Sequence, residues 1–288
     1  MQPPIALEQL ETFAHGLDHP EGICLSPDGH VYVGGEAGQL YRIGDDGGVT
    51  EILSTGGFIL GLAADAGGRI YACDSGNRCV WRITPQSGFI ERWSEGNERE
   101  RLAVPNWGCF DAEGNYYLSD SGQWKQANGR IWVIRPGRTA EVWTDESRDF
   151  PNGMAVDPFQ PRLLVLESTP GRLTELAITA DGLAGPRRVL CDLPGAVPDG
   201  VAVAADGSLV IACYRPDVIY HWSETDGLRV LAEDPEGTVL AAPTNVCFTG
   251  DELDVMVTPN IGRWHLTRLR AGIRGTPLFR PTAAQLGS

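Results

Sequence analysis

Short apolar runs, many of them alternating with polar residues, recur along the whole chain between clusters of turn residues. A typical unit opens with an apolar run, passes through a turn such as PDG, AGG, AEG or ADG, and continues with an alternating run such as RIYACD or NYYLSD. Two runs joined in this way are typical of an antiparallel hairpin. A third run (QLYRI, CVWRI, RIWVI) and a fourth (TEILS, IERWS, AEVWT) follow. The pattern therefore predicts units of four short strands.

The units repeat at a nearly constant period, which is clearest at the residue that follows a Pro near the start of most units. This anchor position is occupied at spacings of 39, 46, 46, 47 and 45 residues by Glu21, Leu60, Asn106, Asn152, Asp199 and Thr244. Four strands in a repeat of about 45 residues are typical of a propeller blade. We therefore predict an all-β fold, a six-bladed β-propeller with four-stranded blades, as a single domain over residues 1–288.

The two ends of the chain suggest how the ring closes. The last unit lacks a fourth run, whereas the N-terminus carries an extra one, LETFAHG, ahead of the first anchor. We predict that this N-terminal strand completes the last blade. Such closure also removes the exposed strand edges of an open array of sheets.

Composition narrows the classes of partner. The 288 residues are 42% hydrophobic, which allows a sizeable core. The formal net charge is −15 and Lys and Arg form no cluster, so we expect no nucleic-acid partner. The first residues, MQPPIALEQLETF, lack the basic and apolar regions of a secretion signal, and no apolar run is long enough to cross a membrane. We expect a cytoplasmic protein that makes no membrane contact; its oligomeric state stays open.

Seven cysteines without a C-x-x-C pair indicate neither a disulfide framework nor a thiolate zinc site. Three of them, Cys24, Cys109 and Cys247, lie three residues after an anchor, where the other units have Ala63, Ala155 and Ala202. A packing position for a small apolar side chain explains this column, so we predict core cysteines.

The anchor column is the main chemical signal. The first strand of every propeller blade runs along the central channel, so the six anchors are expected to meet as a ring at one mouth. A set of two carboxylates and two carboxamides suits a hard cation such as Ca²⁺, which takes six to eight oxygen ligands. The alternative is that Asn and Asp before Gly are simple turn formers. That alternative does not explain Glu21, a poor turn former, in the same register.

The stretches PDGVAVAADGSLVIACY from Pro198 and TNVCFTGDELDVMVT from Thr244 resemble the senescence marker protein/regucalcin/gluconolactonase family, over nearly the whole chain. The resemblance implies a six-bladed propeller with one divalent cation, most simply Ca²⁺, with Zn²⁺, Mn²⁺ or Mg²⁺ as alternatives. By the same resemblance Glu21, Asn152 and Asp199 are metal ligands, Asn106 contacts metal or substrate, and Asp199 is the general base. The implied reaction is metal-dependent hydrolysis of a small-molecule lactone or related ester.

The surroundings of the ring differ from the sugar-lactonase pattern. The stretch RLAVPNWG places Arg101 five residues before Asn106, and Trp107 stands where the resemblance implies an acidic residue. We predict that Phe58, Leu60 and Trp107 make an apolar mouth, which disfavours a polyhydroxylated lactone.

Two further side chains are candidates for the same mouth. Trp124, in the long connection SDSGQWKQANGR, is either a lid over the mouth or a packed surface side chain. His19, two residues before Glu21, is either a second base or a structural loop residue.

Two rival functions stay open on sequence alone. Related six-bladed propellers of the phosphotriesterase, paraoxonase and strictosidine-synthase-like groups carry out other chemistry, because a fold does not determine its reaction. A non-catalytic binding propeller, in which the cation only stabilises the channel, is the alternative from another class.

Overall fold

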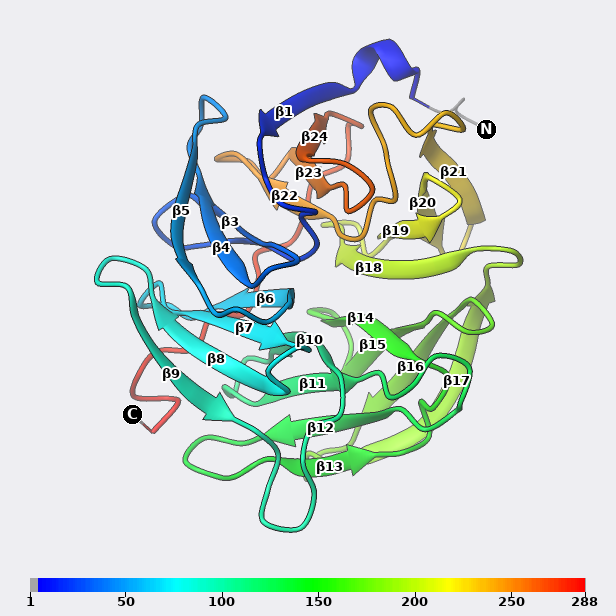
Figure 1. Ribbon diagram of the computed structural model, residues 1–288. Helices are drawn as coiled ribbons and strands as arrows, with labels where there is room; N and C mark the ends of the chain where they lie inside the picture. The colour runs from blue at the N-terminus through cyan, green and yellow to red at the C-terminus, as the bar shows by residue number, and fades with distance from the viewer. Residues whose placement is uncertain (1–4, 288) are drawn as a thin grey trace.

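A computed structural model describes residues 5–287, which form six four-stranded antiparallel sheets arranged radially around a central channel (Figure 1). The six-bladed β-propeller predicted from the repeat is therefore confirmed. The first three blades, each written from the channel outward, are β2 (Ile23–Leu25), β3 (Val31–Gly34), β4 (Gln39–Ile43) and β5 (Val49–Ser54); β6 (Ile59–Ala64), β7 (Ile70–Asp74), β8 (Cys79–Thr84) and β9 (Phe89–Ser94); and β10 (Pro105–Phe110), β11 (Tyr116–Asp120), β12 (Arg130–Ile134) and β13 (Glu141–Thr144).

The last three blades continue the same order. They are β14 (Pro151–Val156), β15 (Arg162–Glu167), β16 (Arg172–Ile178) and β17 (Ala184–Asp192); β18 (Val197–Val203), β19 (Leu209–Arg215), β20 (Val218–Ser223) and β21 (Gly227–Glu233); and β22 (Cys247–Thr249), β23 (Val255–Pro259) and β24 (His265–Leu269) with β1 (Glu11–His15) outermost. A short 3₁₀ helix, η1 (Leu7–Gln9), precedes β1.

The N-terminal strand closes the ring, as predicted. β1 pairs antiparallel with β24, with Glu11 opposite Arg268 and Thr12 opposite Thr267. Two guanidinium nitrogens of Arg268, Nε and Nη2, donate to the Glu11 carboxylate, at 2.7 and 2.8 Å. The sixth blade is thus built from both ends of the chain, so opening the ring would break a whole strand pairing.

The hydrophobic core is divided among the interfaces between blades. Between the second and third blades, for example, the Tyr71 ring meets those of Trp93 and Phe110 edge-on at centroid distances of 4.7 and 5.0 Å. Tyr116 packs against the same group, 4.9 Å from Phe110. Edge-to-face pairs of this kind are favourable beyond the apolar area they bury. Each blade is therefore stabilised mainly by its two neighbours.

Glycine allows the inner strands to approach one another closely. A Cβ atom on Gly22 would lie 1.6 Å from the carbonyl oxygen of Leu60, and one on Gly153 would lie 2.2 Å from that of Asp199. Both glycines directly follow an anchor residue, so the absence of a side chain there lets neighbouring anchors converge on the channel axis.

The C-terminal tail (residues 270–287) crosses the end of the channel opposite the anchors. Gly275 bridges to Ala204, Thr276 N–H donates to the carbonyl of Val203 at 3.1 Å, and Ala66 N–H donates to the carbonyl of Pro281 at 3.0 Å. Figure 1 shows this red segment running behind the ring from β24 toward the second blade. Within the described residues, no helix has the length and apolar character needed to span a membrane.

Candidate active site

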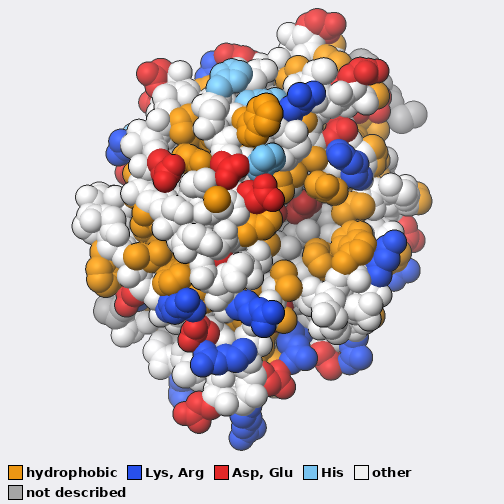
Figure 2. Space-filling model, viewed as in Figure 1, with side chains coloured by type: hydrophobic (Ala, Val, Ile, Leu, Met, Phe, Trp, Pro, Cys, Tyr) orange, Lys and Arg blue, Asp and Glu red, His pale blue; other side chains and the backbone are white. Residues whose placement is uncertain are grey.

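The six anchor residues meet at one mouth of the channel. A cavity of about 400 Å³ is lined by all of them, namely Glu21, Leu60, Asn106, Asn152, Asp199 and Thr244. Each lies within three residues of the start of the innermost strand of its blade. Figure 2 shows a hollow near the centre of this face of the molecule, bordered by hydrophobic side chains. The structure thus brings together residues that are up to 223 positions apart, the separation of Glu21 and Thr244.

Irregular strand pairing accompanies the anchors. The register between first and second strands shifts between Pro105 and Trp107, between Pro151 and Met154, and between Pro198 and Val201. A bulge bends a strand locally and changes the direction of its side chains. The irregularity spans the anchor in each of these blades, and it coincides with the turning of the anchor side chains into the mouth.

Four anchors have a buried oxygen without a hydrogen-bond partner in the part of the chain that the structure describes. These atoms are Oε2 of Glu21 and Oδ1 of Asn106, Asn152 and Asp199. The four side chains are only 4–6% exposed. Buried polar atoms are nearly always paired, so four unpaired oxygens around one cavity need a common partner. A hard cation coordinated by oxygen is such a partner, and the donor set fits it.

The electrostatics of the ring point the same way. Burial raises the pKa of the Glu21 carboxyl well above its usual range, and the neighbouring charge of Asp199 raises it further. Burial likewise raises the pKa of Asp199, and a hydrogen bond with the Asn152 side chain offsets part of that rise. Among the residues that the structure describes, no Lys or Arg lines this cavity. Two buried carboxyls without a cationic partner are unfavourable as anions, and a bound cation would remove that penalty.

Serine hydroxyls form hydrogen bonds between neighbouring blades, and these bonds hold the anchors in place. The Ser168 hydroxyl donates to the carbonyl of Pro198 at 2.7 Å and accepts from Nδ2 of Asn152 at 3.2 Å. The Ser119 hydroxyl donates to the Asn152 carbonyl at 2.9 Å. Nδ2 of Asn152 is therefore fixed on Ser168, which leaves Oδ1 as the atom available to a ligand.

The other two anchors, Thr244 and Leu60, do not present an unpaired side-chain oxygen to the cavity. Thr244 uses its hydroxyl to donate to the backbone carbonyl of Glu21 at 2.8 Å, across the boundary that closes the ring. Leu60 has an apolar side chain that is 7% exposed. Thr244 therefore positions the backbone of Glu21, and Leu60 contributes an apolar patch.

The walls of the mouth include two columns of residues that, apart from Phe58, the sequence analysis missed. One column lies two residues before the anchors and consists of Phe58, Val104, Phe150 and Val197. A second lies at the ends of the second strands or just after them and consists of Ser75, Ser168, Tyr214 and Ile261. The first column could have been found, because residues two apart in a strand point to the same side. The second recurs at spacings of 93, 46 and 47 residues, close to one or two repeat lengths.

Buried carboxylates fix the backbone of the loops that contain the wall residues Phe58 and Val104. Asp74 accepts a hydrogen bond from the backbone N–H of Phe58 at 3.0 Å, and Asp120 accepts one from that of Val104 at 2.7 Å. Phe150 is held at a φ of 59°, in the left-handed region that a bulky residue rarely adopts. Such a conformation persists only where the surrounding structure enforces it.

Trp124 lines the mouth, as the position of its loop suggested. Its ring lies 4.9 Å from that of Phe150 in an edge-to-face arrangement, and it is 45% exposed. Phe58 and Leu60 also line the cavity, as predicted. Whether Trp124 moves as a lid stays a prediction.

Trp107 does not lie in the mouth, contrary to the sequence-based expectation. It is 7% exposed and packs between the third and fourth blades against Tyr117, Ile131 and Met154. The reason is the alternation of side chains along a strand, because the residue after Asn106 points away from the side that Asn106 faces. Trp107 is therefore a core residue between blades.

His19 also lies outside the residues that line the anchor cavity. Its Nδ1 is 2.8 Å from the Asp18 carboxylate and 3.1 Å from that of Glu36, and its ring meets Trp264 edge-on. The side chains of Asp18, His19 and Glu36 lie close enough together to ligate a metal. They are partly or fully exposed, however, and Nδ1 of His19 is already engaged by both carboxylates, so hydrogen bonding accounts for the arrangement. His19 thus lies outside the lining of the anchor cavity, and its hydrogen bonds are compatible with the structural alternative.

Arg101 is turned away from the mouth as well. Its side chain is 72% exposed and pairs with Glu95 at 2.7 Å. No basic side chain thus reaches the anchors from this loop, and the apolar character inferred for the mouth is retained.

The cysteine column faces the opposite end of the channel. Cys24 and Cys247 are buried, as predicted, whereas Cys109 is only partly buried. All three line a second cavity beneath the anchors, together with their alanine counterparts. Burial raises the pKa of each thiol, which makes them poor nucleophiles.

Several solved structures share this architecture. A gluconolactonase from Xanthomonas campestris is 22% identical with a TM-score of 0.78, over 91% of this chain and 89% of that one. A regucalcin from Agrobacterium tumefaciens, described as a calcium-binding protein, is 16% identical with a TM-score of 0.75, over 93% and 98%. A luciferin-regenerating enzyme is 17% identical with a TM-score of 0.74, over 96% and 98%. At these identities the likeness shows the fold alone.

Comparison of the sequence with protein families is more specific. No curated protein matches the chain significantly. A profile for the N-terminal part of strictosidine synthase-like proteins matches the short segment 2–43. The profile described as the SMP-30/gluconolactonase/LRE-like region matches residues 31–258, which is most of the chain. The chain belongs to the SMP-30/gluconolactonase/LRE-like family.

Proposed function

We propose that this protein is a metal-dependent hydrolase that opens a lactone or a related ester. Family membership and the similarity to a gluconolactonase support a hydrolase of small molecules. The observation that carries the proposal is the set of four buried, unpaired oxygens on Glu21, Asn106, Asn152 and Asp199 around one cavity.

Ca²⁺ is the cation that this donor set suits best. All four donors are carboxylate or carboxamide oxygens, whereas Zn²⁺ sites usually include nitrogen or sulfur ligands. The similarity to a regucalcin described as calcium-binding supports the same choice. A bound divalent cation supplies Lewis acidity that polarises an ester carbonyl.

The protein side chains supply proton transfer and orientation. Asp199 is the general base in this proposal, because a carboxylate beside the cation can accept the proton of the attacking water. Asn152, fixed through Ser168, and Asn106 orient the reacting group in the mouth. The surrounding apolar wall binds the non-reacting part of the substrate and excludes bulk water.

The substrate is an alkyl or aryl lactone or ester, in our proposal, rather than a sugar lactone. Phe58, Phe150 and Trp124 line the mouth, and no Lys or Arg within residues 5–287 does. Each hydroxyl of a sugar lactone would lose its hydrogen bonds to water on entering such a mouth, and apolar walls cannot replace them.

Turnover by metal-stripped protein, followed by pH-stat with added Ca²⁺, Zn²⁺, Mn²⁺ or chelator, tests the proposal. We expect Ca²⁺-dependent hydrolysis of dihydrocoumarin and γ-nonalactone, with a higher kcat/KM than for gluconolactone. Preference for gluconolactone would refute the substrate class alone. Uptake of metal without turnover of any lactone or ester would instead identify a binding propeller, and turnover of phosphotriesters alone would favour the phosphotriesterase type.

A further inference from the structure

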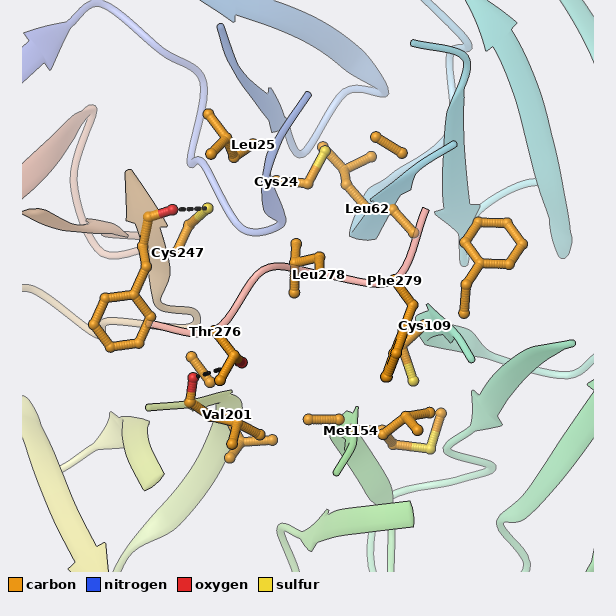
Figure 3. A pocket seen from close by; sticks show the side chains of 18 of the residues that line it. Cys24, Leu25, Leu62, Cys109, Met154, Val201, Cys247, Thr276, Leu278 and Phe279 are labelled. Carbon is orange, nitrogen blue, oxygen red and sulfur yellow. Dashed lines mark hydrogen bonds between the residues drawn. The ribbon is translucent and has the colours of Figure 1, made fainter. Parts of the chain in front are cut away.

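The opposite end of the channel contains a second cavity that the hydrolase proposal does not use. Its volume is about 180 Å³, and it lies between the inner strands and the C-terminal tail. Figure 3 shows Leu278 and Phe279 of the tail projecting among side chains from the inner strands of all six blades, labelled Cys24, Leu62, Cys109, Met154, Val201 and Cys247. Apolar cavities of about 150 Å³ in proteins can bind a molecule such as benzene. The space is therefore large enough for a small organic ligand.

Arg280 is the one charged side chain among the described residues that line this cavity. One of its terminal nitrogens donates to the carbonyl of Leu25 at 2.8 Å, while its Nε is buried without a partner. Arg280 makes no ion pair with any residue that the structure describes. This is notable in a chain with a formal net charge of −15, where carboxylates outnumber basic side chains.

Asn245 supplies a second unsatisfied donor. It is 1% exposed and lines the same cavity, one residue after the anchor Thr244. Its Oδ1 accepts a hydrogen bond from the backbone N–H of Val246 at 2.7 Å, whereas its Nδ2 is buried without a partner. A buried donor left unpaired costs about 1–3 kcal/mol, so a ligand that offers acceptors would be favoured here.

We propose that this lower cavity is a binding site for a small carboxylate with an apolar body, such as an aromatic or short aliphatic acid. The guanidinium of Arg280 pairs with the carboxylate, a geometry that favours two parallel hydrogen bonds. The apolar walls take the hydrocarbon part, and Asn245 offers a further donor. The site is distinct in chemistry from the anchor mouth, whose two charged side chains are acidic.

Binding of benzoate, measured by calorimetry on the full chain and compared with benzyl alcohol as the uncharged analogue, tests the site. We expect saturable binding of benzoate at least tenfold tighter than that of benzyl alcohol. Arg280→Met keeps an unbranched side chain, although a shorter one, but removes the charge, and should weaken benzoate binding tenfold or more. Arg274→Met is the matched control, since Arg274 lies in the same tail, is paired with Glu252 and does not line the cavity. It should bind benzoate like the parent.

A second measurement locates the ligand in the unmodified protein. Cys109 and Cys191 are both partly buried. Cys109 lines the cavity, whereas Cys191 lies in β17, away from it. Benzoate should slow the reaction of Cys109 with methyl methanethiosulfonate, read by peptide mass mapping, and leave that of Cys191 unchanged. Equal affinity for benzoate and benzyl alcohol, unchanged binding in Arg280→Met, equal protection of both cysteines, or no saturable binding would overturn the proposal.

Discussion

Removal of the Ser168 hydroxyl tests whether the anchors form a ligand ring rather than a set of turns. Ser168 is 3% exposed and follows β15. Its hydroxyl donates to the Pro198 carbonyl at 2.7 Å and accepts from Nδ2 of Asn152 at 3.2 Å. Ser168→Ala breaks both bonds without filling new space, so its effects come from the lost hydroxyl.

The expected magnitudes follow from these two contacts. A buried carbonyl or N–H left unpaired costs about 1–3 kcal/mol of the free energy of unfolding. For a domain somewhat smaller than this one, each kcal/mol lowers Tm by about 2–4 °C, so a fall of several degrees is expected. The amide of Asn152 also loses the contact that fixes its orientation. Loss of an outer-shell partner of this kind typically weakens metal binding about 10–100-fold.

The control is Ser121→Ala. Ser121 is fully buried and donates to the carbonyl of Pro151 at 2.7 Å across the preceding blade boundary, but it bonds no anchor side chain. Tm measured with chelator should fall in both variants, whereas the Kd for Ca²⁺, measured by calorimetry, should rise only in Ser168→Ala. Ser168→Thr, which keeps the hydroxyl, should restore Ca²⁺ affinity. Ca²⁺ affinity lowered equally in both alanine variants, or unchanged in Ser168→Ala, would refute the reasoning.

Three further outcomes are expected. Chelation should lower Tm, because a cation that binds only the folded state adds about 2.7 kcal/mol at a hundredfold excess over its Kd; an unchanged Tm would argue against a native metal site. Asp199→Asn, assayed at saturating metal, should lose roughly 10²–10⁴ in kcat by removal of the base, and Asn152→Asp should lose less; near-parental turnover by Asp199→Asn would exclude Asp199 as the base. Trp124→Ala should raise KM for dihydrocoumarin more than for γ-butyrolactone, with little change in Tm because Trp124 is 45% exposed; equal changes in KM would exclude an aromatic contact.

The features that repeat along the chain were predictable from the sequence. The blade count and the hairpin turns follow from the repeat of about 45 residues. The completion of the last blade by the N-terminal strand follows from the fourth apolar run that the last unit lacks. The meeting of the anchors at one mouth follows from the same period, because equivalent residues of successive blades lie at the same height along the channel. Glu21 and Thr244 are far apart in sequence, yet a hydroxyl-to-carbonyl bond of 2.8 Å joins them.

The features that break the repeat were not predictable in this way. The resemblance implies a side chain of the mouth at the position of Trp107, but the irregular pairing at Pro105 and the alternation along β10 direct Trp107 between blades. His19 shares its column with Phe58 and Phe150, yet hydrogen bonds to the carboxylates of Asp18 and Glu36 hold its ring outside the mouth. The lower cavity depends on the C-terminal tail, which lies outside every repeat.

The second blade shows whether a blade needs a polar residue at the anchor position. Leu60 occupies the anchor position of the second blade, where the strand pairing shows the same shift, between Ile59 and Leu62. The blade therefore forms without an oxygen at this position, so Asn152 and Asp199 are not needed there as turn formers. Replacing buried polar groups by apolar ones is often neutral or stabilising, which means that four unpaired oxygens are costly to keep. A fold that could place leucine at each anchor instead retains oxygens pointing into one cavity, and a shared ligand is the physical reason that accounts for all four together.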